Sequence, residues 1–326
     1  MGGNYAVGVD LGGTKILAGV VDTKTGRLVA SKKKKTKQAT HTTLIERITS
    51  AVDEAMETAG IDRRSVSGIG VGAAGMVDRK EGVLLAAANL GINNVPITEP
   101  LNEYYGVPTM LGNDVEVATL AEKYFGAGRN CEHFACVFVG TGIGSGIVVN
   151  GELIRGATGT AGEVGHTILF PDGRQCGCGH LGCLEAYASR TAIAKVLKGA
   201  IDRGVASSVA SKIDETKGIL RSKTIAEAID EGDKLVSGAI IDGARYLGIG
   251  LASVVNFFNP ERIILGGGLV EAVDLYFETV KEEVKARSLP IPGKKLKVVK
   301  AGLGDYAGIV GAALLVTANG KPVAKS

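Results

Sequence analysis

Three of the five cysteines fall within eight residues of one another, and a histidine lies ten positions before the first of them. Three thiolates and an imidazole are the ligands of a closed tetrahedral zinc site. Spacing alone leaves either His166 or His180 as the nitrogen ligand. A disulfide is the alternative, and it is disfavoured because a C-x-C pair cannot easily close on itself. The segment HTILFPDGRQCGCGHLGCLE therefore predicts structural zinc held by Cys176, Cys178 and Cys183.

Carboxylates flank this segment, and another follows an apolar stretch earlier in the chain. Glu163 precedes His166, and Glu185 follows the last cysteine. The pair Asn113-Asp114 ends a strand-like stretch and opens a helical pattern. It is either a plain helix cap or a carboxylate general base beside an amide that holds the acceptor. On the second interpretation, zinc staples a loop that belongs to a polar substrate site.

Three glycine-rich turns could hold phosphate groups, because glycine lets backbone amides approach phosphate oxygens closely. The first is DLGGTK, in which Asp10 could also hold a hydrated magnesium ion; a plain hairpin is the alternative. The second, residues 140–146, joins two strands and fails the spacing of a dinucleotide fingerprint. The third, residues 266–268, follows a strand and precedes a helix. In this order, the turns suggest a nucleotide held between two similar halves.

The elements that must position these residues alternate between strands and helices, which predicts an α/β fold. Apolar patterning predicts hairpins over 5–21 and 134–154, each bent around glycines. Helical spacing predicts a helix over 43–59, with Thr43 and Glu46 as its capping box and Gly60 as its C-cap. Further strands are expected at 67–75, 107–113 and 296–300, a strand, turn and helix at 262–272, and helices at 114–125, 184–200, 224–230, 234–257 and 306–317.

The composition is that of a globular protein with two domains. The chain has 326 residues, 45% of them hydrophobic and 22% charged. A net charge of +3 argues against a nucleic-acid partner, and the basic run Lys32–Lys35 with Lys37 is typical of a solvated face. The N-terminus has no signal-peptide pattern, and no apolar run suggests a membrane partner. With its unpaired cysteines, including a core thiol at Cys136, the protein is expected to be cytoplasmic.

Two segments carry a resemblance to a known family. The run VGTGIGSGIVVNGELIRGATGTAGEVGH (139–166) and CGCGHLGCLE (176–185) are similar to the ROK family of repressors and sugar kinases, most of all to its glucokinases. DLGGTK, GAAGMVD (72–78), ND at 113–114 and LGGG at 265–268 extend the resemblance over nearly the whole chain. It implies a two-lobed actin-like ATPase (ribonuclease H-like) fold. The smaller lobe would be residues 1–112 completed by about 304–326, and the larger, zinc-stapled lobe would be 113–303.

The resemblance also implies a role for each matching residue. Asp114 matches the base that deprotonates the sugar hydroxyl, and His166, in preference to His180, matches a zinc ligand that also binds the sugar. The implied zinc ligands are His166, Cys176, Cys178 and Cys183. The implied sugar-binding residues are Gly75, Asn89, Asn113, Asp114, Glu163, His166 and Glu185. The implied nucleotide-binding residues are Asp10, Gly12, Gly13, Thr14, Lys15, Thr141, Gly142, Gly267 and Gly268.

The implied activity is transfer of a phosphoryl group from ATP with Mg²⁺ to the 6-hydroxyl of a hexose, with glucose first. N-acetylmannosamine, mannose, fructose and allose are alternative acceptors, and ADP or polyphosphate alternative donors. Val115 and Glu116 after Asn113-Asp114, and the missing tryptophan after Asn89-Leu90, depart from the family pattern and bear on the choice of sugar. A repressor would carry an added N-terminal helix-turn-helix, and a chaperone-type ATPase would not explain the zinc-flanking carboxylates. The expected assembly is a homodimer or homotetramer.

Overall fold

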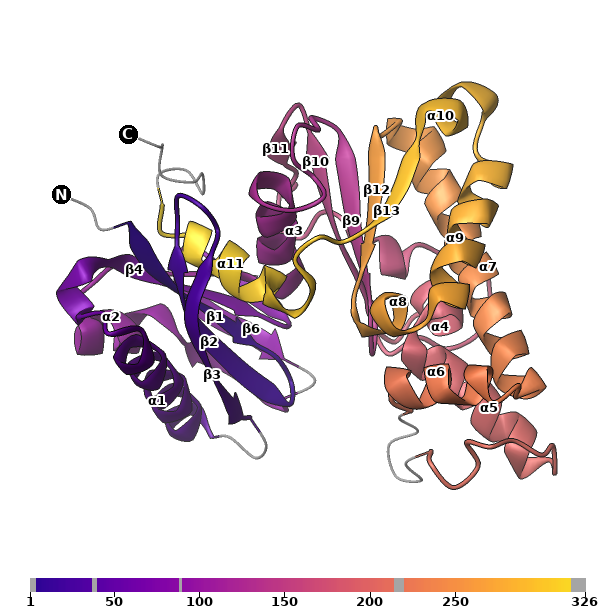
Figure 1. Ribbon diagram of the computed structural model, residues 1–326, viewed down its shortest axis with the longest axis horizontal. Helices are drawn as coiled ribbons and strands as arrows, with labels where there is room; N and C mark the ends of the chain where they lie inside the picture. Colours follow the sequence, from indigo (N-terminus) through magenta and orange to yellow (C-terminus); the bar gives the residue numbers. More distant parts are fainter. Residues whose placement is uncertain (1–3, 37–39, 88–89, 214–219, 318–326) are drawn as a thin grey trace. The chain divides into compact units, whose positions relative to one another are not determined.

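The chain forms two compact units, which are described separately (Figure 1). The computed structural model describes residues 4–36, 40–87, 90–213 and 220–317. The first unit comprises residues 1–130 and 305–326, and the second comprises 131–304. The first boundary therefore lies at 130 and not at the predicted 112. The reason is that the helix α3 (Asp114–Tyr124) packs on strand β4 (Val66–Ala73) and on the C-terminal helix α11 (Ala307–Leu314), both of the first unit.

The main sheet of the first unit has the strand order β3-β2-β1-β4-β8. β1 (Tyr5–Leu11) and β2 (Lys15–Asp22) form the predicted antiparallel hairpin, and β3 (Leu28–Lys35) extends it. β4 and β8 (Thr109–Asn113) continue the sheet in parallel with β1. Asp10 pairs with Gly72, and Asn113 with Ala73. The carboxyl ends of three parallel strands thus bring Asp10 and Asn113 to one edge of the sheet, where ligands bind in open α/β folds.

Helices cover both faces of this sheet because successive strand residues point to opposite sides. Val7 and Val9 lie in one apolar cluster with Leu44 of helix α1 (His41–Ala59). Gly8, between them, faces the other side, where a Cβ would lie 1.9 Å from the backbone oxygen of Ile309 in α11. The missing side chain lets α11 lie directly on the strands.

Helix α1 begins earlier than its apolar pattern predicts. Thr40 is its N-cap: its side chain accepts from the Thr43 amide while the Thr43 hydroxyl accepts from the Thr40 amide. Thr43 is therefore the third residue of the capping box and not its first, so the predicted box with Glu46 is wrong. Apolar spacing marks the buried face of a helix, whereas a cap is set by backbone dihedrals before that face begins. The predicted C-cap at Gly60 is confirmed, with a left-handed φ of 67°.

Several elements of the first unit have no counterpart in the predictions. The basic run lies in β3, an edge strand, where charged side chains discourage pairing with another chain; Lys37 lies outside the described residues. A second, three-stranded antiparallel sheet has the order β5-β6-β7. These strands and the short helices nearby are β5 (Met76–Asp78), β6 (Val83–Ala87), β7 (Ile92–Pro96), α2 (Thr98–Tyr105) and the 3₁₀ helix η1 (Arg63–Ser65).

The sheet of the second unit repeats the topology of the first, with the order β11-β10-β9-β12-β13. β9 (Phe134–Val139) and β10 (Ile143–Val149) form the second predicted hairpin, with β11 (Glu152–Leu153) beside β10. β12 (Arg262–Gly266) and β13 (Lys297–Lys300) run parallel to β9. In both units a hairpin with a third antiparallel strand is extended by two parallel strands. The prediction of two similar α/β halves is confirmed.

Helices pack on the second sheet around one large apolar cluster that includes the fully buried Tyr276 and Leu184. Helix α7 (Lys234–Phe258) is long and apolar enough to cross a membrane by those two criteria, and half of its apolar stretch is buried in the unit. The sequence analysis missed α9 (Asp274–Arg287) and α10 (Pro290–Lys295). The other helical segments of the second unit are η2 (Val164–His166), α4 (Glu185–Ala188), α5 (Arg190–Asp202), α6 (Ser222–Asp230) and α8 (Gly268–Ala272). The 3₁₀ helix η3 (Gly304–Tyr306) begins at the last residue of the second unit.

Candidate functional site

The predicted zinc ligands lie together in the second unit. The ligand atoms of His166, Cys176, Cys178 and Cys183 all lie within 4.8 Å of one another. The Sγ atoms of Cys178 and Cys183 are 3.7 Å apart, and Cys176 Sγ is 3.7 Å from His166 Nδ1. A tetrahedral zinc ion with bonds of about 2.3 Å to sulfur separates its sulfur ligands by about 3.8 Å. The donor set and its spacing therefore fit zinc.

The same geometry decides between the alternatives left open by the sequence. A disulfide needs sulfur atoms about 2.05 Å apart, far closer than Cys178 and Cys183. His180 lies beside the cluster, with Nδ1 3.5 Å from Cys178 Sγ, but it is His166 that completes the group of four. A backbone hydrogen bond from His180 lowers the pKa of Cys178 to about 6, which favours the thiolate that binds metal.

Glu185 connects the zinc cluster to the second glycine turn. Its Oε2 accepts a hydrogen bond of 2.8 Å from the Ile143 amide, at the start of β10. Its Oε1 lies 3.5 Å from Cys176 Sγ. A Cβ on Gly142 would lie 2.4 Å from Oε2, so the absence of a side chain there is what admits the carboxylate. The turn at Thr141-Gly142 and the zinc loop are thereby held in one arrangement.

Glu163 immediately precedes the 3₁₀ helix η2, which ends at His166. Ser145 of β10 donates from its hydroxyl to the Gly162 oxygen and accepts from the Val164 amide, so the backbone on both sides of Glu163 is fixed. The Glu163 side chain itself is exposed. His166 and Glu185 both contact Cys176, and Glu163 precedes His166 by three residues. Their role in a polar substrate site stays a prediction.

The predicted residues Asp10, Asn113 and Asp114 belong to the first unit and lie at the carboxyl edge of its sheet. Burial, and then the negative charge of Asp114, raise the pKa of Asp10 to about 6, while the positive charge of Lys15 lowers it. Lys15 begins β2 on the far side of the Gly12–Thr14 turn, which closes with a 3.0 Å bond from the Gly12 amide to the Lys15 oxygen. A partly buried carboxylate among other carboxylates is a fitting ligand for a hydrated Mg²⁺ ion.

Asn113 is the N-cap of α3, and Asp114 is the first helical residue. The Asn113 Oδ1 atom accepts from the amides of Val115 (2.9 Å) and Glu116 (3.2 Å), and its Nδ2 donates to the Gly75 oxygen at 3.1 Å. The cap interpretation is thus right for Asn113, and its amide also ties α3 to the Gly75 turn. Asp114 follows it into the helix N-terminus, where the backbone dipole stabilises negative charge. Asn89 lies outside the described residues.

Arg190 and Ser222 belong to the second unit, and the sequence analysis did not find them. Arg190 is the first residue of α5, and its guanidinium donates to the Thr141 hydroxyl (3.1 Å) and the Ser222 hydroxyl (3.4 Å). A Cβ on Gly268 would lie 3.6 Å from that same Ser222 oxygen. The two glycine turns predicted to bind nucleotide, at Thr141 and at Gly268, therefore meet around this arginine. A lone arginine far along the chain from both turns gives no sequence signal.

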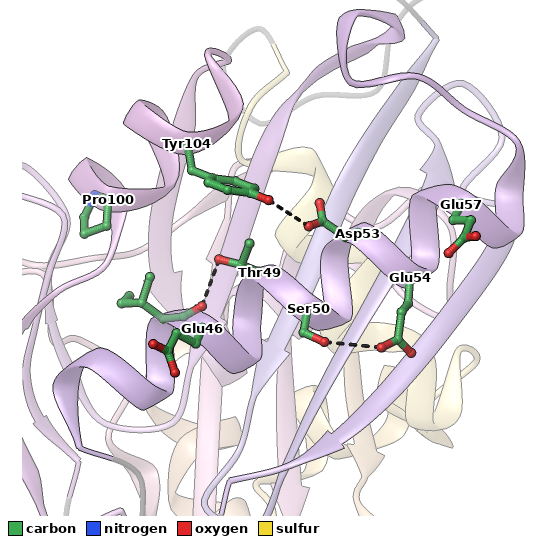
Figure 2. Close-up of a pocket in the computed structure, with 9 residues that line it drawn as sticks. Glu46, Thr49, Ser50, Asp53, Glu54, Glu57, Pro100 and Tyr104 are labelled. Atoms are coloured by element: carbon green, nitrogen blue, oxygen red, sulfur yellow. Dashed lines mark hydrogen bonds between the residues drawn. The ribbon is translucent and has the colours of Figure 1, made fainter.

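A separate groove of about 530 Å³ lies between α1 and α2 in the first unit. Figure 2 shows Tyr104 donating to Asp53, with Glu46, Glu54 and Glu57 along the same helix. The described residues that line this groove include none of the predicted site residues. Of its acidic side chains, Glu46 and Glu57 are exposed, whereas Glu54 pairs with Lys34 and Asp53 with Arg63. The groove is therefore no part of the candidate site.

Comparison with known proteins assigns the chain to a family. Residues 6–319 match the sequence model of the ROK family. The chain belongs to the ROK family. A glucokinase of Halalkalibacterium halodurans is 33% identical to this ROK protein, over 97% of this chain and 96% of that one. The xylose repressor of Caldicellulosiruptor bescii is also 33% identical, over 81% of this chain and 66% of the repressor.

Solved structures show the same relationship. A ROK family glucokinase from Streptomyces griseus, determined with glucose and AMPPNP, superposes with a TM-score of 0.82 at 35% identity, over 95% of this chain and 98% of that one. A ROK hexokinase from Thermus thermophilus superposes with a TM-score of 0.77, also at 35% identity, over 95% and 96% of the two chains. The predicted family and two-lobed fold are confirmed. Enzymes and regulators both occur among the relatives.

Proposed function

We propose that this ROK protein transfers the γ-phosphoryl group of ATP to the 6-hydroxyl of a hexose, with glucose as the first acceptor. The observation that carries the proposal is the position of Asp114. It is the first residue of α3, at the sheet edge that also holds Asp10, in a chain whose ROK relatives include glucokinases at 33–34% identity over nearly their whole length. The glucose and AMPPNP bound to the S. griseus glucokinase support the same two ligands here.

In this proposal the residues of the first unit prepare the acceptor and the phosphoryl group. Asp114 takes the proton from the 6-hydroxyl, and Asn113 holds the loop around Gly75 against α3 so that the acceptor has one orientation. Asp10 and Lys15 flank the Gly12–Thr14 turn. Its Gly13 and Thr14 amides would face the phosphates, since the Gly12 amide donates to the Lys15 oxygen. When bound, Mg²⁺ would neutralise charge on the phosphates beside Asp10. Phosphoryl transfer demands mainly this alignment and charge stabilisation.

The residues of the second unit select the sugar. Glu163 and Glu185 accept hydrogen bonds from hydroxyl groups, and His166 adds an imidazole nitrogen. When bound, zinc would fix the His166 ring through Nδ1, the atom that faces Cys176, and so leave Nε2 for a hydroxyl group. A sugar that lacks the matching hydroxyl would leave one of these groups unpaired, which is how such a site discriminates between hexoses.

The test is ADP release by the purified protein from ATP and Mg²⁺, with glucose, mannose, N-acetylmannosamine, fructose or allose. We expect a response to glucose above the sugar-free rate. Release at one rate in every sample, including the sugar-free one, would contradict the proposal. Hexose binding without turnover would instead favour a sugar-sensing regulator, as in the repressors of the family. Polyphosphate in place of ATP tests the other donor, which one relative, a polyphosphate/ATP-glucomannokinase of Arthrobacter, uses by its name.

The role of Asp114 is tested by Asp114→Asn, which should keep hexose binding and lower kcat on the order of a thousandfold. Asp274→Asn is the matched control. Asp274 is also the first residue of a helix, its side chain is 87% exposed, and its loss removes the same charge from a helix N-terminus. Turnover in Asp114→Asn equal to that of the control would refute the assignment of the base.

A further inference from the structure

Arg190 is a partly buried cation whose polar contacts are hydroxyl groups. Within the described part of the chain, its guanidinium hydrogen-bonds to Thr141 and Ser222, and no described carboxylate forms an ion pair with it. Partial burial lowers its pKa from the ordinary value, although a guanidinium stays charged near neutral pH. A cation that is partly removed from water without an anionic partner is unfavourable, and a bound anion relieves this cost.

The surroundings of Arg190 define where such an anion would lie. Its own amide donates to the Gly140 oxygen at 3.0 Å, which fixes the start of α5 against the glycine turn between β9 and β10. Ser222 starts α6, and the Gly268 backbone lies beside the Ser222 hydroxyl. The guanidinium therefore contacts the turn that carries Thr141, and through Ser222 it lies near the turn that carries Gly268.

Gly267 shows how closely the backbone approaches at the second of these turns. Its φ of 88° lies in the left-handed region, and a Cβ would lie 2.6 Å from the Val139 oxygen, so only glycine fits. The turn consequently runs against the end of β9, next to the turn that carries Thr141. Two adjacent glycine turns with a guanidinium near them suit an extended anion with several oxygens better than a single carboxylate.

We propose that Arg190 binds the phosphate chain of the nucleotide donor. Each hydroxyl uses one N–H of the guanidinium, and its remaining N–H groups can donate to phosphate oxygens. Thr141 and Ser222 hold the guanidinium in place, so little side-chain entropy is lost on binding. This inference rests on the proposed function for the nature of the donor. It adds Arg190 to the nucleotide site, a residue that belongs neither to the three glycine turns nor to the sugar site.

The test measures the affinity of the full chain for ADP with Mg²⁺ and for adenosine, which has the same base and ribose without phosphates. Arg190→Met should weaken ADP binding by about 10- to 100-fold, the range for a hydrogen bond to a charged group. Adenosine binding should change by less than about twofold, because adenosine has no phosphate to lose a contact. In turnover, KM for ATP should rise while KM for the hexose stays the same.

Arg203→Met is the matched control. Arg203 lies at the other end of α5, is exposed, and its replacement removes the same charge from the same helix. ADP binding by this variant should equal that of the wild type. Arg190→Lys keeps the positive charge and provides a second variant if Arg190→Met does not fold; it should bind ADP with intermediate affinity.

Three results would overturn the inference: ADP affinity unchanged in Arg190→Met, equal weakening of ADP and adenosine, or a wild-type chain that binds neither ADP nor tripolyphosphate. Equal weakening would mean that Arg190 only holds the turns together. The binding measurement needs no phosphoryl transfer. A wild-type chain that binds ADP but phosphorylates no hexose would therefore refute the proposed function. The ADP affinities of the Arg190 variants would still test the role of Arg190.

Discussion

A single added methyl group at Gly142 should break the link between the glycine turn and the zinc loop. A Cβ there would lie 2.4 Å from Glu185 Oε2, whereas ordinary contacts begin at 3.4 Å. The carboxylate must therefore move by about 1 Å, which disrupts its 2.8 Å hydrogen bond from the Ile143 amide. Loss of a charge-assisted hydrogen bond costs about 1.5–3 kcal/mol. For a unit of this size, Gly142→Ala should then lower Tm by about 3–12 °C.

The assay is thermal unfolding followed by circular dichroism, with the zinc content of each variant measured in parallel. Gly140→Ala is the matched control, because Gly140 lies in the same turn and a Cβ there would have no heavy atom within 4 Å. Its Tm should stay within about 2 °C of the wild type, as for substitutions that disturb no packing. The two variants add the same methyl group two residues apart, so only the contact with Glu185 distinguishes them.

A double-mutant cycle would show whether the effect acts through Glu185. In a Glu185→Ala background the added methyl group has no carboxylate to displace, so Gly142→Ala should cost little. The interaction energy between the two positions should then equal most of the single-mutant loss. An equal fall in Tm in both backgrounds would refute the reasoning, as would a Gly142→Ala protein with the Tm of the wild type.

Three further predictions concern charge, metal and packing. The pKa of Asp10 is raised from 3.8 to about 6, so ionisation of Asp10 destabilises the fold by up to about 3 kcal/mol as pH rises from 4 through 6. Without Mg²⁺, Asp10→Asn should therefore melt above the wild type at pH 8, and a gap as large at pH 4 would contradict the assignment. Cys178→Ser should lose zinc and lower Tm, whereas Cys131→Ser should keep zinc; metal analysis that finds equal zinc in both would place the ion elsewhere. A Cβ on Gly70 would lie 1.7 Å from the Ala312 oxygen, so Gly70→Ala should destabilise the first unit by about 1–3 kcal/mol or more. A denaturant midpoint equal to that of the wild type would show that α11 does not pack on this strand.

The elements that the sequence predicted well are those whose signal is local. Both hairpins carry alternating apolar residues around glycines, and α7 has a long helical pattern, so their periodicity alone identified them. The capping box of α1 was misplaced because a threonine three residues away fits the same pattern. α9 was missed because its charged residues obscure the few apolar positions, such as Phe277 and Val280, that join the apolar cluster of the second unit, where α9 packs on α7.

The zinc loop is the part of the site that the sequence determined by itself. The chain has only five cysteines, and three of them, Cys176, Cys178 and Cys183, lie within one short segment. This residue type at this spacing is enough to predict a metal site without any knowledge of the fold. The choice of His166 over His180 rested on resemblance, and in the structure it rests on distance. The helix start at Asn113-Asp114 could also be predicted from the sequence, because a capping side chain bonds to backbone amides only two or three residues away.

Tertiary structure alone decided which distant residues meet. The equal strand order of the two sheets depends on pairing between strands that are distant in the sequence, such as β1 with β4. The contacts of Glu185 with the Ile143 amide and of Arg190 with Thr141 each join residues more than 40 positions apart. Such contacts depend on how strands pair and helices pack, and no local pattern records them. The residue types in the sequence identify the side chains that can bind metal, phosphate or sugar. Strand pairing and helix packing determine which of these side chains lie close to one another.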